Sequence, residues 1–270
     1  ICWGQDPYDQ VTDTPTGTGY TSLSAGGVYT CAIDAAGGIV CWGRDDGGLY
    51  DYGAVTDAPT ETGYTVVAGG HRHGCALDAA GSITCWGYDG YDQVSDTPSG
   101  SGFTSISAGG NHTCALDTAG SITCWGLDDD DQVSDAPTEA GYAAVFGGAR
   151  YTCALDAAGS ITCWGWDAYD QVSDAPPSYE GFYTAVSAGD NHTCATENET
   201  LGVTCWGYDG SGQVSDVPGS WWLKSPSAGG NHNCMLHMAT GSTPFEIACW
   251  GDDTYGQTSD APTEPGNSDV

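Results

Sequence analysis

Short runs of alternating apolar and polar residues recur along this chain, separated by glycines, prolines and aspartates. In one copy, residues 103–107 alternate in this way, which is the pattern of a half-buried β-strand. Residues 111–117 and 121–125 are predicted as a second and a third strand, and residues 132–134 as a short fourth strand. No segment keeps the apolar period of about 3.6 residues that an amphipathic helix requires. The pattern therefore predicts an all-β protein.

A Cys-Trp-Gly triplet ends the third predicted strand of each copy, and successive triplets are 39 to 44 residues apart. This period is typical of four-stranded propeller blades and of some helical repeats. The composition argues against helical repeats, because 42 of the 270 residues are glycine and only 4 are lysine or arginine. The triplets begin at residues 2, 41, 85, 124, 163, 205 and 249.

The second and third strands of a copy are predicted to form a hairpin whose register follows from its two cysteines. If Cys114 faces Cys124, then Leu116 faces Ile122, and residues 118–120 form a loop that ends in glycine, the favoured place for a left-handed residue. Directly opposed cysteines in antiparallel strands lie close enough for a disulfide. This pairing leaves Cys2 without a partner. The predicted pairs are Cys31 with Cys41, Cys75 with Cys85, Cys114 with Cys124, Cys153 with Cys163, Cys194 with Cys205, and Cys234 with Cys249.

Side chains alternate between the two faces of a strand, so each sheet is predicted to have two different faces. Cys114 and Leu116 lie on the face expected to pack on the next blade, whereas Trp125 lies on the other face. His112 is opposite Gly126, and a ring resting over a glycine indicates packing and hydrogen bonding rather than metal binding. Two other copies have tyrosine in place of this histidine, which supports the same interpretation.

Three segments of one copy carry a family resemblance. Residues 107–117 read Ser-Ala-Gly-Gly-Asn-His-Thr-Cys-Ala-Leu-Asp, followed by Ile-Thr-Cys-Trp-Gly at 122–126 and Gln-Val-Ser-Asp-Ala-Pro at 132–137. The motif resembles the repeat of the regulator-of-chromosome-condensation superfamily of β-propellers, and most of all the short secreted bacterial repeats of the β-lactamase-inhibitory propeller type. The resemblance implies a seven-bladed propeller. It does not imply guanine-nucleotide exchange, because the nuclear member is free of disulfides and its partner surface has no recognisable counterpart in this chain.

The blade count departs from seven complete copies. The chain has seven Cys-Trp-Gly strands but only six preceding strands of the Ala-Gly-Gly…Cys type. We therefore expect one propeller domain, residues 1–270, with seven blade positions, an incomplete closing blade and one hairpin disulfide per complete blade; six blades and a spare strand are the alternative. An unpaired Cys2 and an unfilled sheet edge are features that join protomers. The repeats are expected near residues 2–40, 41–84, 85–123, 124–162, 163–204 and 205–248, with a partial copy at 249–270.

The charge is extreme, with 36 acidic residues against 4 basic ones and a net charge of −32. Nucleic-acid binding through phosphates is excluded, because it needs a basic footprint. Membrane insertion is not expected, because the chain has no long apolar run. Thirteen cysteines without a Cys-x-x-Cys motif indicate disulfides and an oxidising compartment. We therefore expect an extracellular or cell-surface protein, in a mature or excised form that starts in mid-repeat.

Aspartates recur after the Trp-Gly pairs with the spacing Asp-x-x-Asp-x-x-x-Asp. Calcium favours several carboxylate oxygens at one point, so these aspartates are candidate ligands, and calcium is the one cofactor that the sequence suggests. The alternative is that each aspartate caps a turn through its own backbone. No EF-hand spacing is present. The candidate ligands are Asp89, Asp92, Asp96, Asp128, Asp131, Asp135, Asp167, Asp170 and Asp174.

Two further sets of residues are candidate surface sites. Trp166, Trp221 and Trp222 lie outside the repeat pattern and, with tyrosines of the loops after Trp-Gly, are expected to form an exposed aromatic rim for protein or sugar recognition. The alternative is that they fill gaps around irregular loops. Three Asn-x-Thr sequons fit an exported glycoprotein. The candidate glycosylated residues are Asn111, Asn191 and Asn198.

No catalytic constellation stands out in the sequence. There is no Gly-x-Ser-x-Gly motif or phosphate-binding glycine loop, and paired cysteines cannot act as nucleophiles. We therefore expect a secreted, non-catalytic propeller that serves as a structural or protein-interaction module of an extracellular or cell-surface assembly, through a protein partner or self-assembly. A soluble inhibitor that binds a protein through one propeller face is one alternative. A calcium-dependent carbohydrate-binding module is the other.

Overall fold

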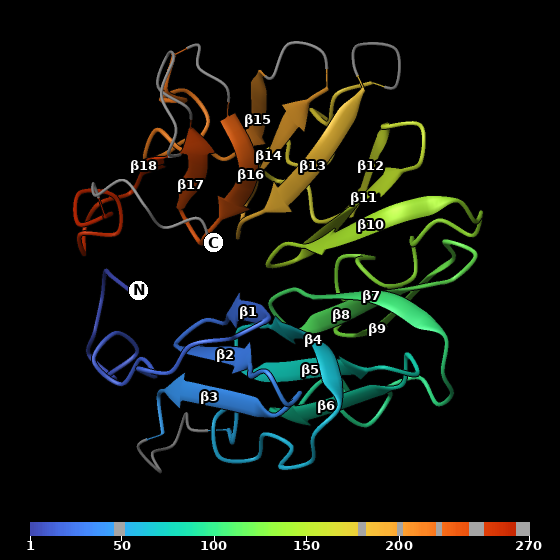
Figure 1. Cartoon of the computed structure of the whole chain (residues 1–270). Helices are drawn as coiled ribbons and strands as arrows, with labels where there is room; N and C mark the ends of the chain where they lie inside the picture. The colour runs from blue at the N-terminus through green and yellow to red at the C-terminus, as the bar shows by residue number, and fades with distance from the viewer. Residues whose placement is uncertain (46–51, 178–181, 199–201, 220–222, 238–245, 263–270) are drawn as a thin grey trace.

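Six three-stranded antiparallel sheets follow one another in chain order around a common centre in the computed structural model (Figure 1). The structure describes residues 1–45, 52–177, 182–198, 202–219, 223–237 and 246–262. Each sheet is a blade, and the blades are numbered one to six along the chain. The first strands of successive blades contact one another, so they lie nearest the centre.

The first three blades contain β1 (Ser22–Ala25), β2 (Tyr29–Ile33) and β3 (Ile39–Gly43); β4 (Tyr64–Gly69), β5 (His73–Asp78) and β6 (Ile83–Gly87); and β7 (Phe103–Ala108), β8 (His112–Asp117) and β9 (Ile122–Gly126). Blades four to six contain β10 (Tyr142–Gly147), β11 (Tyr151–Asp156) and β12 (Ile161–Gly165); β13 (Tyr183–Ala188), β14 (His192–Glu197) and β15 (Val203–Gly207); and β16 (Leu223–Ala228), β17 (His232–His237) and β18 (Glu246–Gly251).

The hairpin of β8 and β9 has the register predicted from its cysteines. Cys114 is opposite Cys124 and Leu116 is opposite Ile122, and the two cysteines form a disulfide across the strands. Gly120 ends the loop with φ +76°, the left-handed conformation expected there. Asp117 Oδ1 accepts hydrogen bonds from two backbone N–H groups of the loop and fixes it. Each of the six blades has the equivalent disulfide.

The predicted fourth strand is absent, and this prediction was wrong. Residues 132–134 lie in consecutive turns between blades three and four. Asp131 has φ 60°, which breaks an extended conformation. Asp128 Oδ1 accepts hydrogen bonds from the N–H groups of Val133 at 2.8 Å and Ser134 at 3.0 Å. These backbone donors are therefore not available to a sheet, and the blades have three strands.

The core lies between blades rather than within them. Cys114 and Leu116 of blade three, both fully buried, pack against Val145, Ala154 and Trp164 of blade four. The disulfide-bearing face of one blade thus contacts the tryptophan-bearing face of the next, as predicted. Thin three-stranded blades bury little apolar surface alone, so the stacking and the disulfides together stabilise them.

A hydrogen bond from a tryptophan to a backbone carbonyl joins each pair of neighbouring blades, and in four of these bonds the carbonyl belongs to a fully buried glutamine. Trp125 Nε1 donates to the carbonyl oxygen of Gln93 at 3.0 Å. The fully buried Gln93 side chain accepts from the N–H of Tyr91 at 2.8 Å, which holds the turn that presents that carbonyl. The other tryptophan–carbonyl pairs are Trp3 with Gln257, Trp42 with Gln10, Trp86 with Ala54, Trp164 with Gln132, Trp206 with Gln171, and Trp250 with Gln213.

The histidines that precede the hairpin cysteines form a second set of contacts between blades. A hydrogen bond of 2.8 Å joins His112 Nε2 and Thr152 Oγ1 of the next blade. His73 makes the same contact with Thr113 at 2.8 Å. Burial lowers the pKa of His112 to about 4 and that of His73 to about 3, so both rings are neutral near pH 7. These rings pack and hydrogen-bond, as the sequence indicated. The glycine under the ring was predicted wrongly, because the His112 ring rests over Gly109, whereas Gly126 contacts the backbone of Asn111 and His112.

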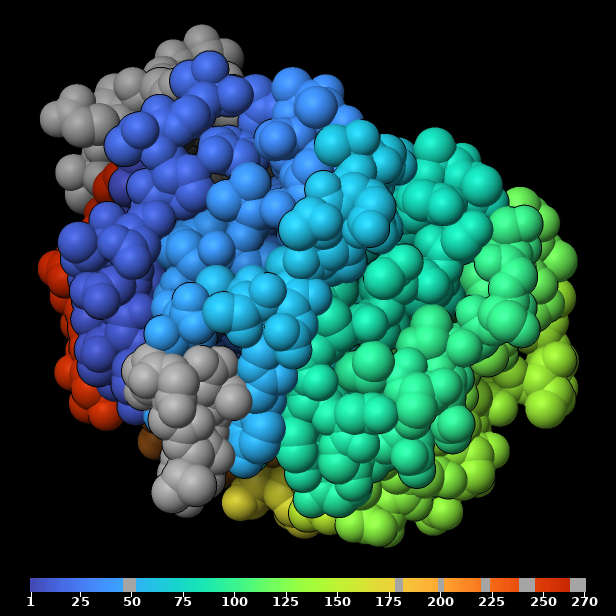
Figure 2. Space-filling model, turned by 90° about the horizontal axis from the view of Figure 1, so that it is seen from below, coloured from blue at the N-terminus to red at the C-terminus, as the bar shows by residue number. Residues whose placement is uncertain are grey.

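Residues 2–4 occupy a seventh position between blade six and blade one. Trp3 Nε1 donates to the carbonyl oxygen of Gln257 at 3.0 Å, which repeats the contact of the six other repeat tryptophans. Figure 2 shows the N-terminal residues directly against residues near the end of the described chain. No strand of the described residues lies at this position, and the described residues form six complete blades. Cys2 is not in a disulfide.

Candidate binding face

The arginines and most of the non-repeat aromatic side chains described below lie at one end of the propeller. Because the strands are antiparallel, the second strand of each blade begins where the third strand ends, as His112 opposite Gly126 shows. The loops that follow the third strands lie at this end, which we call the loop face. The opposite end carries the tight hairpin loops, such as residues 118–120.

Two side chains meet across the centre of the loop face. His71 of blade two and Asp190 of blade five are 119 residues apart in sequence, and His71 Nε2 lies 3.3 Å from Asp190 Oδ1. The hydrogen bond from His71 lowers the pKa of Asp190 against the opposing effect of burial. Gly110 and Gly230 occupy the equivalent places in two other blades, where an added Cβ would lie 3.2 Å from the His71 ring and 3.1 Å from the Asp190 carboxylate. The sequence offered no partner for His71.

The first cluster on the loop face lies between blades one and two. Arg72 stacks over the ring of Tyr52 at 5.0 Å. Tyr52 packs on Tyr88 with ring centroids 4.5 Å apart, and Tyr88 meets Tyr91 edge-on at 5.8 Å. Tyr91 is 42% exposed, so this cluster is open to a partner.

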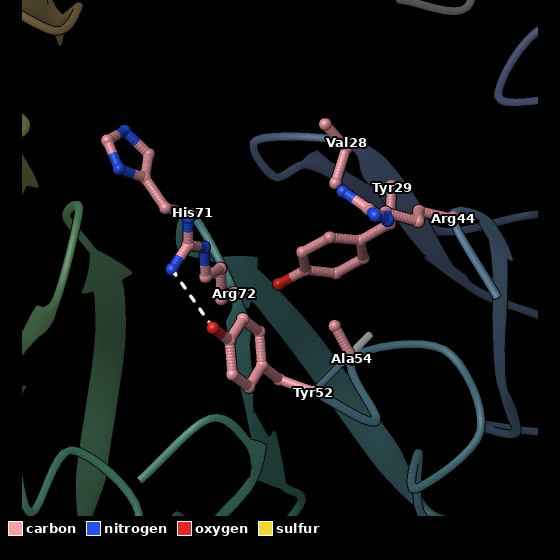
Figure 3. A pocket seen from close by; sticks show the side chains of 7 residues that line it. All are labelled: Val28, Tyr29, Arg44, Tyr52, Ala54, His71 and Arg72. Carbon is pink, nitrogen blue, oxygen red and sulfur yellow. Dashed lines mark hydrogen bonds between the residues drawn. The ribbon is translucent and has the colours of Figure 1, made fainter. Parts of the chain in front are cut away.

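A small pocket adjoins this first cluster (Figure 3). Arg72 Nη1 donates to the hydroxyl of Tyr52 at 3.5 Å, and the Tyr29 hydroxyl points toward the same space. Arg44, whose guanidinium stacks over Tyr8 at 4.5 Å, lines the other side. The pocket therefore combines cationic and phenolic groups on an otherwise acidic protein.

The second cluster repeats this chemistry between blades four and five. Arg150 lies over the ring of Trp166 at 5.4 Å and forms an ion pair with Asp130. Trp166 meets Tyr169 edge-on at 5.2 Å, and Tyr169 packs on Tyr208 at 4.7 Å. Trp166 thus lies with its predicted tyrosine neighbours. Trp221 and Trp222 lie outside the described residues.

The arginines were the part of these clusters that sequence reasoning missed. Arg72 and Arg150 occupy the same repeat position, one residue before the buried histidine or tyrosine, where three other blades have asparagine. Two basic residues at one repeat position, in a chain with only 4, were the available signal. Guanidinium groups bind well to aromatic faces, which explains their stacking on Tyr52 and Trp166.

The aspartates of the loops cap turns. Asp89 Oδ1 accepts from the N–H groups of Val94 and Ser95 at 2.8 and 2.9 Å. Burial raises the pKa of Asp89, but these hydrogen bonds outweigh it and the net pKa is lowered. The described residues contain no group of three histidine, cysteine or acidic side chains arranged to hold a metal ion. These hydrogen bonds are the ones expected if each aspartate caps its own turn. The same cap recurs at Asp128, Asp167, Asp209 and Asp253.

The three sequon asparagines lie in two different environments. Asn111 and Asn191 are half-buried on the loop face, at the repeat position where Asn231 stands without a sequon. Asn198 is exposed beyond the end of β14. Asn198 is therefore the most accessible of the three to a glycan. No helix among the residues described is long and apolar enough to cross a membrane.

Comparison with known proteins agrees with the fold. The model of the "Regulator of chromosome condensation (RCC1) repeat" matches residues 103–132, which run from the first strand of blade three into the turns after it. No curated protein matches the chain. The ectodomain of the receptor kinase CR4 from Physcomitrella patens is 26% identical with a TM-score of 0.72. That comparison covers 90% of this chain but only 64% of the ectodomain, so this chain spans less than two thirds of it.

Two further solved structures share the fold at lower identity. The ectodomain of the receptor kinase ACR4 from Arabidopsis thaliana is 19% identical, with a TM-score of 0.53 and coverage of 86% of this chain and 97% of that one. Prp20p from Saccharomyces cerevisiae, described with its binding to Gsp1p and histones, is 18% identical, with a TM-score of 0.66 and coverage of 85% and 71%.

Proposed function

We propose, from the premise that this chain is an RCC1-like repeat β-propeller, that it serves as a non-catalytic protein-interaction module outside the cell. The observation that carries the proposal is the pair of arginine–aromatic clusters on the loop face, around Tyr52 and around Trp166. Tryptophan, tyrosine and arginine are the residue types that contribute most binding free energy at protein interfaces.

The two clusters have the architecture of anchors for a partner. In each, an arginine and three aromatic rings from adjacent blades contact one another, so little side-chain entropy remains to be lost on binding. Tyr169, 41% exposed, projects from the second cluster as Tyr91 does from the first. A net charge of −32 surrounds them, which disfavours acidic partners and favours a partner with a basic rim.

An extracellular location is supported by the covalent chemistry. Each of the six described blades has one disulfide between its second and third strands, and such bonds persist in oxidising compartments. Two of the similar solved structures are receptor-kinase ectodomains, one at 26% identity. A structural or adhesive role in a cell-surface assembly is the form of this function that we favour.

The test is partner capture from the extracellular fraction of the source organism. The native chain is cross-linked in that fraction, and the proteins joined to it are identified by mass spectrometry. The same capture is then repeated with Tyr169→Ala and with Tyr91→Ala. We expect at least a tenfold loss of the partner for each variant, since removal of an interface anchor costs about 2 kcal/mol.

Phe182→Ala is the matched control. Phe182 is 61% exposed and lies beside the hairpin loop at Gly159, on the end opposite the loop face. This variant removes an exposed aromatic ring of similar size and is expected to retain the partner. Equal retention by all three variants, or loss only with Phe182→Ala, would contradict the loop face as the binding surface.

A further inference from the structure

A groove lies beside β15, the outermost strand of blade five. Its volume is about 420 Å³, which falls within the range of about 300–1,000 Å³ that is typical of ligand sites. Pro176 and Pro177, which precede blade five, line it together with residues 204–207 of β15. Val214 and the buried Tyr183 add apolar surface. The groove shares no residue with the two clusters on the loop face.

The outer edge of β15 offers backbone groups for pairing. Cys205 is directly opposite Cys194 with the two Cα atoms 4.1 Å apart, which is the close spacing of a non-hydrogen-bonded antiparallel pair. The N–H and C=O of Cys205 therefore point away from β14, toward the side on which the described sheet ends. Among the described residues, no hydrogen bond joins either group to another part of the chain. A strand edge of this kind is a template for an added strand.

Pro177 distinguishes this edge from the edges of the other blades. The other copies of the Asp-x-Pro turn have threonine, serine or glycine after the proline. Proline has a fixed φ and no backbone N–H, so Pro177 is rigid and cannot itself donate a strand hydrogen bond to β15. The segment that leads into blade five thus borders the groove without pairing with its strand.

The groove is acidic. The exposed Asp174 and the half-buried Glu197, at the end of β14, contribute carboxylates, and among the described residues no basic side chain lines the groove. The Thr204 hydroxyl donates to Glu197 Oε1 at 3.0 Å, which holds that carboxylate beside β15. The net charge of −32 adds to the attraction for cationic groups. A basic occupant is therefore the one that matches the charge of the groove.

We propose that this groove binds an extended, basic segment of a partner protein, which adds a fourth strand to blade five along β15. The backbone of the segment exchanges hydrogen bonds with the N–H and C=O of Cys205. Side chains alternate between the two faces of a strand, so arginine or lysine at every second position reaches Asp174 and Glu197. The aliphatic part of these side chains packs on Pro177. This second site is independent of the loop face, so either proposal can fail without the other.

The test uses the full chain and the peptide acetyl-Thr-Lys-Val-Arg-Val-Lys-Thr, which carries a fluorescent label at its C-terminus. Fluorescence anisotropy at about 0.15 M salt measures the Kd, since salt at this concentration screens charges that are far apart. Hydrogen exchange locates the bound peptide. We expect protection of the Cys205 amide and none of the Cys124 and Cys163 amides, which occupy the same place in blades three and four.

Two pairs of substitutions separate the groove from the overall charge. Asp174→Asn combined with Glu197→Gln removes two charges from the groove, and the glutamine keeps an acceptor for Thr204. We expect the Kd to rise about fivefold or more, because each exposed ion pair contributes up to about fivefold in affinity. Asp96→Asn combined with Asp135→Asn is the matched control. It removes two charges at the repeat position of Asp174 in other copies, and the Kd is expected to stay within about twofold.

Peptides methylated on alternate backbone nitrogens separate strand pairing from charge attraction. One carries the methyl groups on both valines, and the other carries them on the lysines and the arginine. Only one set of N–H groups faces β15, so we expect one of the two peptides to bind at least about tenfold more weakly than the other. Equal binding of the two peptides, an equal effect of the two pairs of substitutions, or a Cys205 amide left unprotected would overturn the proposal. So would failure of the unmodified peptide to bind, or loss of its binding in Tyr169→Ala.

Discussion

Trp125 donates its indole N–H to the backbone carbonyl of Gln93, 32 residues earlier in the chain and one blade away. The two atoms are 3.0 Å apart, and both residues are buried. The same tryptophan–carbonyl bond recurs at the other junctions between described blades, so it is one of the contacts that hold neighbouring blades together.

Trp125→Phe removes this donor and part of the ring. We expect a loss of about 2 kcal/mol in the free energy of unfolding, because the Gln93 carbonyl is left buried without its partner. Urea denaturation followed by circular dichroism measures the change. Trp166→Phe, at the half-buried loop-face position, is the control, with an expected loss below about 1 kcal/mol. Equal losses would show that the bond at Gln93 is not special.

The buried histidines predict a dependence of stability on pH. The pKa of His112 is lowered to about 4 by burial, whereas in the unfolded chain it is near 6.5. The unfolded state therefore binds the proton first, so the stability from this neutral ring is present above pH 6.5 and is lost as pH falls toward 4. The loss amounts to up to about 3 kcal/mol for a fully buried ring.

His112→Tyr isolates the effect. Blade four already has Tyr151 at this repeat position, resting over Gly148 as His112 rests over Gly109. Unfolding measured between pH 4 and pH 7 is expected to lose part of its pH dependence, while stability at pH 7 changes little. A pH dependence identical to that of the wild type would show that His112 titrates normally in the folded chain.

The hairpin disulfides are expected to contribute most of their stability through the unfolded state. Replacing Cys114 and Cys124 together by alanine opens a cross-link between residues 10 apart in sequence. We expect a loss of about 3 kcal/mol in the free energy of unfolding. Thermal melting without reductant measures it. If the double variant has the same Tm as the wild type, the disulfide adds no stability and packing alone holds the register of β8 and β9.

Ile106→Ala and Leu23→Ala form a matched pair on the first strands. Ile106 is 6% exposed and packs between blades two and three, so its truncation is expected to cost about 3 kcal/mol. Leu23, at the equivalent position, is 64% exposed and its truncation is expected to cost less than about 0.5 kcal/mol. Denaturant midpoints compare the two. Equal costs would mean that Leu23 is covered in solution.

Calcium is expected to leave the melting temperature unchanged. Asp128 Oδ1 already accepts two backbone N–H groups, and Asp131 and Asp135 make no group with it that could hold an ion. Melting in calcium and in a chelator compares the two states, and Asp128→Asn, which keeps the acceptor oxygen, is expected to melt close to the wild type. A Tm that rises with calcium and falls back with the chelator would contradict this prediction and support a calcium site at these aspartates.

The fold was predictable where the signal was local. Cys114 and Cys124 are ten residues apart, so their pairing and the glycine of the loop fixed the hairpin register. The role of Gln132 was not predictable in this way. It recurs at a fixed place, but its function is to present a carbonyl to Trp164 of another blade at 3.0 Å. Short-range pattern therefore favoured a strand where a turn was needed.

On the loop face, too, local features were predictable from the sequence and contacts between distant blades were not. The aromatic residues after Trp-Gly were visible as repeats with unusual composition, and Trp166 lies in the predicted cluster. The contact of His71 with Asp190 joins residues 119 positions apart, and neither residue is a repeat feature. Only the arrangement of the blades around the centre brings these two side chains together.

The stacking of one blade on the next also determines how the molecule unfolds. The tryptophan-bearing face of each blade covers the disulfide-bearing face of the blade before it, so the stability of a blade depends on its immediate neighbours, as in other repeat proteins. Hydrogen exchange should be slowest in β8 and β11, whose residues are almost all buried, and faster in β17, whose residues are less buried. Local unfolding is therefore expected to spread from one blade to the next.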